Sequence, residues 1–327
     1  MPVVDRPDDR PQRVVVFGAG AVGCYFGAKL AEAGTPVTLI GRAAHMDAVR
    51  RDGLLFDSGG VQRRIRLDTD TGAESVRKAH WVLFCVKTRD TEAAARQIAP
   101  LLRPDAVVVS LQNGVDNVER LRTSGIDALG AVVYVAAAMA GPGHLRHSGR
   151  GDLVVGEYGG ARGEAAMAGA AQPSARTLAV ARLFEGAGVP CRVEADVRAA
   201  LWDKLVANCA FNAISALTRS RYGPMIDDAD VRRLMRETID ECVRVAHADG
   251  VALAGTDAQY DAAMRLGEAM REASSSMEQD LSSGRRTEID SLNGYVCRRG
   301  EALGIATPAN RTLTTLVRLL ERSVTGG

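Results

Sequence analysis

The chain has 327 residues, of which 46% are hydrophobic and 25% charged, and its formal net charge is +1. This length allows two domains, and the composition is that of an ordinary globular protein. Because acidic and basic residues are interspersed, the sequence offers no basic stripe for nucleic acid and no polybasic segment for a membrane surface. We therefore expect a small-molecule partner, and the cysteines described next lead us to expect a cytoplasmic location.

The first segment, the longest apolar run and the cysteines bear on targeting, membrane insertion and metal binding. Met1 to Gln12 is rich in proline, aspartate and arginine and lacks the apolar core of a signal peptide, so we expect a flexible tail. The longest apolar run, Ala131 to Ala140, is too short to span a bilayer. The six cysteines form no C-x-x-C pair, which indicates reduced thiols and no metal site; they are Cys24, Cys85, Cys191, Cys209, Cys242 and Cys297.

From Arg13 onward, short apolar runs alternate with helical patterns, which is typical of a parallel sheet covered by crossover helices. A Gly- and Ala-rich stretch at 159–175 reads as a mobile loop, and a helix is expected at 176–185. We therefore predict an α/β fold with an N-terminal Rossmann-like, doubly wound parallel sheet over residues 13–195. The expected strands are 14–17, 36–40, 80–86, 106–111, 128–137, 153–156 and 189–193.

After about Asp196 the strand pattern stops and only helical patterns follow. This change predicts an all-helical C-terminal domain over residues 196–327, which we assign to substrate binding and dimerisation. The expected helices are 197–217, 230–249, 256–272, 288–303 and 309–321.

A glycine motif lies between the first strand and the first helix. Three glycines at this spacing allow a tight turn, close approach of the backbone to a pyrophosphate, and close packing of helix on strand. The helix N-terminus then faces the negative charge of the pyrophosphate. Because strand, motif and helix occur together, the sequence predicts a dinucleotide site formed by Gly18, Ala19, Gly20, Ala21, Val22 and Gly23.

Three polar residues follow other strands of the predicted sheet. Arg42 stands about 20 residues past the last glycine, where NAD-binding domains carry an acid for the ribose 2′-hydroxyl. A guanidinium there can pair with a 2′-phosphate, which favours NADP; the alternative is a solvated loop arginine. Lys87 either faces the cofactor or is simply exposed, and Asn113, in a Leu-Gln-Asn-Gly sequence, either faces a ligand or only shapes a turn.

The expected helix 197–217 carries Lys204, Asn208 and Asn212 at intervals of four residues. On a helix this spacing places the three side chains on one face, in a stripe on the order of 12 Å long. Their neighbours are mostly apolar. Because buried polar groups need partners, the stripe indicates either an internal network, with the asparagines bound to each other and to the backbone, or a ligand.

Two further residues carry weaker signals of their own. Ser276 ends a run of three serines, and such runs usually begin turns or cap helices. Glu288 follows Thr287, which we expect to cap the helix 288–303, with Asp290 placed close to a capping-box position. Considered alone, Glu288 is as well explained as a first-turn carboxylate that the helix dipole stabilises.

Taken together, these motifs resemble the ketopantoate reductase family, the 2-dehydropantoate 2-reductases. The resemblance covers nearly all of 13–321 and also includes the segments 142–147, 275–280 and 286–290. It implies an NADP-binding Rossmann-like domain, a helical C-terminal domain and an active site in the cleft between them. It also implies an NADP-dependent oxidoreductase that reduces 2-dehydropantoate (ketopantoate) to pantoate, a step of pantothenate biosynthesis.

Carried over by position, the resemblance makes Lys204 the catalytic acid and Glu288 a partner of the substrate or of Lys204. It places four further residues near the substrate: Asn113, Asn208, Asn212 and Ser276. Reduction of a ketone by hydride builds negative charge on oxygen, so a cation able to give up a proton must lie within hydrogen-bond reach of it. Lys204 meets that requirement.

Other functions remain open at this point. A paralogue could keep Lys204 and act on another 2-oxo acid or ketone, since one methylene of fit is worth only about 1–3 kcal/mol. The Ser276 and Glu288 motifs disfavour a β-hydroxyacid dehydrogenase, and the intact lysine and asparagines disfavour a non-catalytic NADP-binding regulator. A homodimer through the helical domain is a further expectation.

Overall fold

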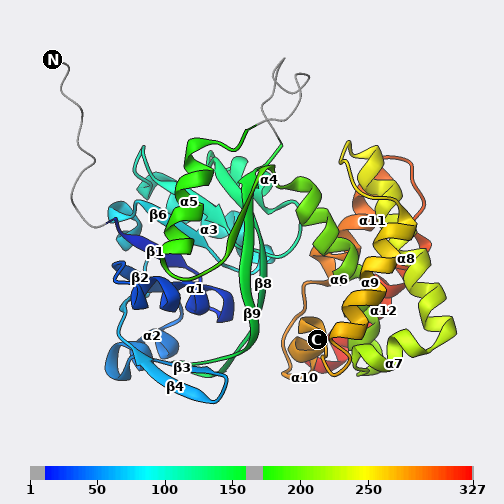
Figure 1. The fold of residues 1–327 in the computed structure, drawn as a ribbon, viewed down its shortest axis with the longest axis horizontal. Helices are drawn as coiled ribbons and strands as arrows, with labels where there is room; N and C mark the ends of the chain where they lie inside the picture. The colour runs from blue at the N-terminus through cyan, green and yellow to red at the C-terminus, as the bar shows by residue number, and fades with distance from the viewer. Residues whose placement is uncertain (1–11, 160–171, 326–327) are drawn as a thin grey trace. The chain divides into compact units, whose positions relative to one another are not determined.

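The computed structural model describes residues 12–159 and 172–325 (Figure 1). Most of the expected tail at 1–12 and of the expected mobile loop at 159–175 lies outside the described residues. The chain forms two compact units. The sheet unit runs to Gln112 and continues over Asn117–Val197, and the helical unit consists of Asn113–Asp116 and the chain from Arg198 onward.

The sheet unit contains ten described strands in the order β4-β3-β9-β8-β7-β6-β1-β2-β5, with β10 paired to β9. The strands from β8 to β5 in this order are parallel neighbours, so the carboxyl ends of β2, β1, β6 and β7 meet at one edge. The bounds are β1 Val14–Phe17, β2 Val37–Ile40, β3 Leu54–Ser58, β4 Val61–Ile65, β5 Asp68–Asp70, β6 Trp81–Phe84, β7 Val107–Ser110, β8 Ala128–Gly141, β9 His144–Glu157 and β10 Cys191–Asp196.

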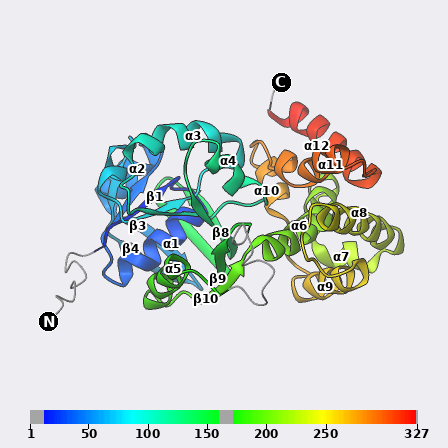
Figure 2. The same ribbon diagram turned by 90° about the horizontal axis from the view of Figure 1, so that it is seen from above.

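Helices cover both faces of this sheet, with α1 and α5 on one face and α3 and α4 on the other (Figure 2). The core of the unit includes buried residues of β1 and α1 together with buried residues of β2, β6, β8, β9 and α5. The predicted doubly wound α/β fold is thus confirmed. The bounds are α1 Ala21–Glu32, α2 Ala43–Asp52, α3 Thr91–Ile98, α4 Asn117–Arg122 and α5 Ala175–Gly186, with short 3-10 turns η1 Glu74–Lys78, η2 Thr88–Asp90 and η3 Ala99–Leu101.

The sheet extends beyond the predicted strands. β8 and β9 are 14 residues each and pair antiparallel, whereas the sequence predicted strands of ten and four residues there. Their connection turns at Gly143, whose φ of 71° favours glycine. The strands β3, β4 and β5 were not predicted. β4 exposes four consecutive residues and so lacks the alternation that marks a half-buried strand, and β5 has only three residues.

The helical unit is built around α6, which packs against α8, α10 and α12. Its Trp202 and Phe211 are almost fully buried. The single helix expected at 288–303 is wrong: a short turn, η5, precedes α11, and the chain breaks at Leu292 (φ −108°, ψ −107°). The bounds are α6 Arg198–Thr218, α7 Tyr222–Asp227, α8 Ala229–Ala248, α9 Thr256–Ala269, α10 Ser276–Ser282, η5 Ile289–Ser291, α11 Asn293–Ala302 and α12 Pro308–Thr325.

Within residues 12–159 and 172–325, no helix is both long enough and apolar enough to cross a lipid bilayer.

Candidate functional site

The glycine loop between β1 and α1 is shaped first by the protein's own packing. Gly18 has a φ of 107°, and a Cβ on it would lie 2.7 Å from the main-chain carbon of Cys85. A Cβ on Gly23 would lie 2.4 Å from the Gly18 oxygen and 2.7 Å from a methyl of Val16. These two glycines are therefore required for the tight turn and for the close contact of helix and strand.

Gly20 is different, because the protein does not need it for packing. It is exposed, its φ of −84° suits any residue, and a Cβ on it would meet no described atom within 4 Å. The open space lies at the start of α1, whose first turn carries no acidic residue. Amides at a helix N-terminus with open space in front of them suit an anion such as a pyrophosphate.

The other members of the loop support this geometry. Ala19 is buried and its amide donates a hydrogen bond to the Ile40 oxygen at 2.8 Å, which holds the loop against the end of β2. Ala21 and Val22 are half-buried in the first turn of α1. The loop is therefore held between the end of β2 and the first turn of α1.

Two cationic residues follow the strands on either side of β1, the strand that precedes the glycine loop. Arg42 follows β2 and Lys87 lies three residues beyond β6, and these strands are the two neighbours of β1. Both side chains are exposed. The guanidinium of Arg42 makes no hydrogen bond or ion pair with any described residue, so it is available to an anionic ligand.

The Leu-Gln-Asn-Gly sequence divides its polar residues between two roles. Gln112 is buried and donates hydrogen bonds to the Val86 oxygen at 3.0 Å and to Thr91 Oγ1 at 2.7 Å. It therefore ties the end of β7 to the end of β6, a role that the sequence did not reveal. Gly114, with a φ of 95°, makes the expected turn.

Asn113 connects two of the predicted site residues. Its Oδ1 accepts a hydrogen bond from Lys204 Nζ at 2.8 Å, and its Nδ2 donates one to Glu288 Oε2 at 3.2 Å. Because an ammonium only donates and a carboxylate only accepts, these partners fix the orientation of the amide. Lysine, asparagine and glutamate thus form a chain of hydrogen bonds within the helical unit.

The asparagines of α6 extend this polar surface. Asn208 is half-buried and Asn212 is buried. Among the described residues, neither side chain has a hydrogen-bond partner, so the pair does not form the internal network that the sequence left open. Both side chains therefore offer amide groups in the row that begins at Lys204, and these groups suit a polar ligand.

The start of α10 is held against α6. Ser275 Oγ accepts a hydrogen bond from the Glu278 amide at 3.0 Å and donates one to the Asn212 oxygen at 3.3 Å. Ser275 therefore caps α10, which leaves Ser276 exposed as its first residue. The sequence suggested a serine cap without identifying which serine supplies it.

Glu288 is half-buried and lies directly before η5. The expected capping box at the start of a long helix is wrong. Instead, Thr287 Oγ1 accepts a hydrogen bond from the Ile289 amide at 3.1 Å and stabilises a short turn. The dipole of a long helix therefore does not account for Glu288, whereas its bond to Asn113 does.

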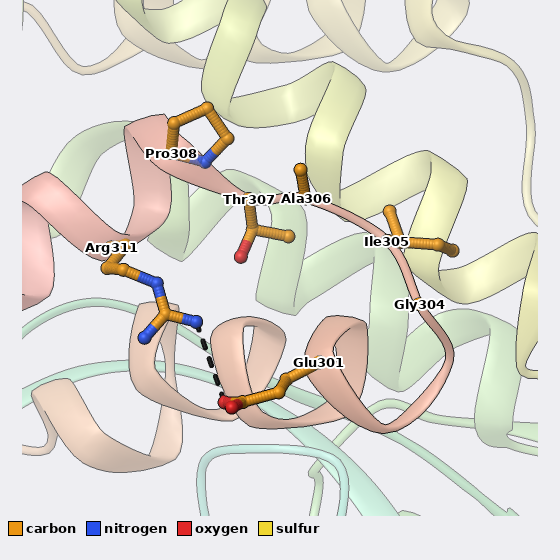
Figure 3. Close-up of a pocket in the computed structure, with 7 residues that line it drawn as sticks. All are labelled: Glu301, Gly304, Ile305, Ala306, Thr307, Pro308 and Arg311. Atoms are coloured by element: carbon orange, nitrogen blue, oxygen red, sulfur yellow. Dashed lines mark ion pairs between the residues drawn. The ribbon is translucent and has the colours of Figure 1, made fainter.

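A separate pocket lies between the end of α11 and the start of α12 (Figure 3). It has a volume of about 440 Å³ and contains none of the predicted site residues. Its one ion pair joins Arg311 to Glu301 at 3.6 Å. The amides of Ala309 and Asn310, at the start of α12, already donate to the buried Glu241 carboxylate. This pocket therefore offers no anion site at the helix start.

No group of three His, Cys, Asp or Glu side chains within the described ranges could hold a metal ion. All six cysteines are free. Burial raises the pKa of Cys24 and of Cys191 to about 12, so neither thiol is activated as a nucleophile.

Comparison with known proteins gives a consistent result. Residues 14–160 match the family model described as Ketopantoate reductase PanE/ApbA, and residues 196–321 match the model of its C-terminal part. A 2-dehydropantoate 2-reductase of Halobacterium salinarum is 35% identical over 95% of this chain and 99% of its own. Another, from Archaeoglobus fulgidus, is 33% identical over 95% of this chain and 99% of its own.

Solved structures show the same relationship. The crystal structure of a PanE/ApbA family ketopantoate reductase from Ralstonia eutropha JMP134 is similar with a TM-score of 0.87 and 44% identity, over 96% of this chain and 99% of that chain. A D-mandelate dehydrogenase in complex with NADH and anilino(oxo)acetate shares the fold, with a TM-score of 0.86 at 22% identity, over 96% and 99% of the two chains. The glycine loop, the polar row of α6 and the family models over both units agree: the chain belongs to the ketopantoate reductase family.

Proposed function

We propose that this protein catalyses the NADPH-dependent reduction of a 2-oxo acid, with 2-dehydropantoate as substrate and pantoate as product. The observation that carries the proposal is the hydrogen-bonded chain of Lys204, Asn113 and Glu288 within the helical unit. Family membership supports the choice of substrate, since relatives at 33–35% identity over most of the chain are 2-dehydropantoate 2-reductases.

NADPH, when bound, supplies the hydride that adds to the carbonyl carbon of the substrate. As the π bond of the carbonyl breaks, negative charge develops on its oxygen, and Lys204 Nζ donates a proton to that oxygen to form the hydroxyl. The bond to Asn113 Oδ1 restricts the lysine side chain and so directs the ammonium before the reaction. The neutral amine that remains regains its proton from solvent.

Glu288 accepts the other hydrogen bond of the Asn113 amide, which keeps that amide from rotating. Asn208 and Asn212 offer amide groups to the polar atoms of the substrate, and the exposed hydroxyl of Ser276 suits a carboxylate. These roles follow from the residue types and from their places on α6 and α10.

The cofactor proposal rests on the sheet unit. The open space at Gly20 and the start of α1 suit the pyrophosphate, with Ala19, Ala21 and Val22 forming the rest of the loop. The guanidinium of Arg42, which has no partner among residues 12–159 and 172–325, suits a 2′-phosphate and therefore favours NADPH over NADH. Lys87 supplies a second positive charge beyond β6.

The decisive assay follows the loss of NADPH absorbance with 2-dehydropantoate, in parallel with pyruvate, 2-oxoisovalerate and benzoylformate, and with NADH as a control. We expect fast turnover only with 2-dehydropantoate and NADPH. Turnover of benzoylformate instead would show a paralogue whose pocket accepts an aromatic 2-oxo acid. Absence of any turnover, with NADPH still bound, would reject the proposed substrates.

A matched variant tests the role of the lysine. Lys204→Met keeps the length of the side chain and removes the proton donor, so kcat should fall by at least about 100-fold. NADPH binding, measured by fluorescence titration, should stay within about twofold of wild type. Loss of NADPH binding in this variant would reassign Lys204 to the cofactor.

We further propose that the protein works in the reducing environment of the cytoplasm as a homodimer formed through the helical unit. The free cysteines support the first point. The exposed side chains of Leu316, Leu319 and Val324 on α12 support the second, since large apolar groups at a helix surface favour association. Light scattering of the purified protein tests the dimer, and a monomer at micromolar concentration would reject it.

A further inference from the structure

We propose that Glu321 and Arg318, both on α12, are positioning residues for Glu288. This proposal rests on the proposed function, because it assigns these residues a part in orienting the reductase site. Glu321 Oε1 accepts a hydrogen bond from the Thr287 amide at 2.6 Å. Arg318 Nε donates a hydrogen bond to Asp290 Oδ1 at 2.7 Å.

The two contacts lie on either side of Glu288 in the sequence. One holds the residue directly before Glu288 and the other holds the residue two positions after it. Both come from neighbouring turns of one helix, so α12 binds the segment 287–290 at two points. A side chain whose main chain is held on both sides has little freedom to shift.

The segment 287–290 has little regular structure to fix it otherwise. η5 is only three residues long, and its local bonds run from the Ile289 amide to Thr287 Oγ1 and from the Ser291 amide to the Glu288 oxygen. These bonds fold the turn on itself without attaching it to another helix. The buried side chain of Ile289 and the two contacts with α12 therefore hold the turn in place.

The position of Glu288 matters because its bond to Asn113 is long. At 3.2 Å it lies at the upper end of the range for such hydrogen bonds. A shift of about 1 Å would break it and release the amide that also holds Lys204 Nζ.

The helix that holds Glu288 is itself anchored. The buried Asn310, in its first turn, donates to Glu241 Oε2 at 2.8 Å and accepts from Asn293 Nδ2 at 2.9 Å. Asn293 Nδ2 also donates to the oxygen of Cys209, which follows Asn208 on α6. This buried network links α12 to the helix that carries Lys204, so the two contacts of Arg318 and Glu321 hold Glu288 in a fixed relation to α6.

The two contacts differ in strength. Arg318 and Asp290 are 50% and 63% exposed, so solvent screens their ion pair and it adds little to folding stability. Glu321 is half-buried and binds a main-chain amide with a carboxylate, a stronger kind of hydrogen bond. Removal of Glu321 should therefore affect the site more than removal of Arg318.

The test compares Glu321→Ala, Glu321→Gln and, as a matched control on the adjacent exposed position, Arg322→Ala. Glu321→Ala should lower kcat/KM for 2-dehydropantoate by about 10- to 100-fold, mainly through kcat. Glu321→Gln keeps an acceptor for the Thr287 amide and should restore the rate to within about threefold of wild type. Arg322→Ala should behave as wild type, and Arg318→Met should show a smaller loss than Glu321→Ala.

Amide hydrogen exchange, followed by mass spectrometry on the peptide that contains residues 287–292, provides a readout that does not depend on activity. Exchange there should be faster in Glu321→Ala than in wild type and normal in Glu321→Gln, with the unfolding midpoint close to that of Arg322→Ala. The proposal is overturned if Glu321→Ala keeps the wild-type kcat/KM, or if Glu321→Gln is as impaired as Glu321→Ala.

The same design separates this proposal from the proposed function. If the wild-type protein reduces none of the 2-oxo acids, the proposed function fails before any variant is compared. The exchange measurement then still decides whether Glu321 holds the segment: faster exchange in Glu321→Ala supports the contact, and unchanged exchange overturns it.

Discussion

The ammonium of Lys204 donates a hydrogen bond to the side-chain oxygen of Asn113 at 2.8 Å, although the two residues are 91 positions apart in the sequence. Asn113 belongs to the helical unit, while the preceding residue, Gln112, is bonded to the end of β6 in the sheet unit. Two adjacent residues thus belong to different units of the chain. The chain therefore passes from the sheet unit to the helical unit between these two residues.

Asn113→Asp tests this relationship with almost no change in shape. The aspartate keeps an acceptor for Lys204 but loses the donor to Glu288, so that two carboxylates face each other at about 3 Å. We expect kcat to fall by about 10- to 100-fold, with an unfolding midpoint near that of wild type. Steady-state kinetics with NADPH and 2-dehydropantoate measure the effect. Full activity of Asn113→Asp would mean that the bond to Glu288 has no part in the reaction.

Local sequence was sufficient for much of the fold. The glycine motif, the apolar strand before it and the helix after it all lie within twenty residues, and β1 and α1 form where the pattern predicted them. The row of polar residues on α6 was also predicted from spacing alone, because a helix of 21 residues keeps its period over that length. In both cases the signal lies within a stretch of about twenty residues.

The contacts of the site could not be predicted in the same way. The bond from Asn113 to Glu288 joins residues 175 positions apart, and no local pattern encodes such a pairing. Glu321 and Arg318 look from the sequence like the polar side of an amphipathic helix, and only the folded chain shows that they hold the segment around Glu288. The resemblance to a family supplied the roles of single residues, while the contacts between them came from the structure.

A pair of glycine substitutions separates cofactor binding from folding. Gly20→Ala adds a methyl group in open space at an ordinary φ, so the free protein should keep its stability. The methyl group would occupy the space in front of α1, and the Kd for NADPH should rise by about tenfold or more. Fluorescence titration and thermal unfolding measure the two effects. Unchanged NADPH affinity in Gly20→Ala would place the cofactor elsewhere.

Gly23→Ala should have the opposite effect to Gly20→Ala, because it should lower the stability of the free protein. Its methyl group would lie 2.4 Å from the Gly18 oxygen, so helix and strand must separate. We expect a loss of about 1–3 kcal/mol in the free energy of unfolding. A Gly23→Ala protein with wild-type stability would show that the helix can move away from the strand without cost.

The preference for NADPH should depend on Arg42. Its guanidinium has no partner among the described residues, so Arg42→Ala removes no structural bond. Hydrogen bonds to a charged group contribute about 1.5–3 kcal/mol, so the Kd for NADPH should rise by about 10- to 100-fold while that for NADH stays nearly unchanged. Equal effects on the two cofactors would remove Arg42 from the 2′-phosphate site.

In the sheet unit, His45 of α2 contacts both Cys24 of α1 and the turn between β8 and β9. Its Nδ1 accepts a hydrogen bond from the Gly143 amide at 2.8 Å, so this nitrogen carries no proton. The neutral ring therefore holds its proton on Nε2, which lies 3.3 Å from Cys24 Sγ. Burial lowers the pKa of His45 from its ordinary value. The folded protein thus keeps this histidine neutral at a pH where the unfolded chain begins to protonate it.

This shift gives the sign of a pH effect. With a folded pKa below the unfolded value of about 6.5, the unfolded chain binds more protons as the pH falls, so the contribution of His45 to stability is complete above that pH and is lost below it. His45→Gln keeps an acceptor for the Gly143 amide and cannot be protonated. Thermal unfolding of both proteins from about pH 7.5 to 5.5 should show a steeper fall of Tm in wild type, because only wild type has this histidine to protonate. Both proteins share the same carboxylates, so the effect of the carboxylates drops out of the difference between the two curves. Parallel curves would mean that His45 is protonated equally in the folded and unfolded states, and that the Gly143 amide does not hold the ring neutral.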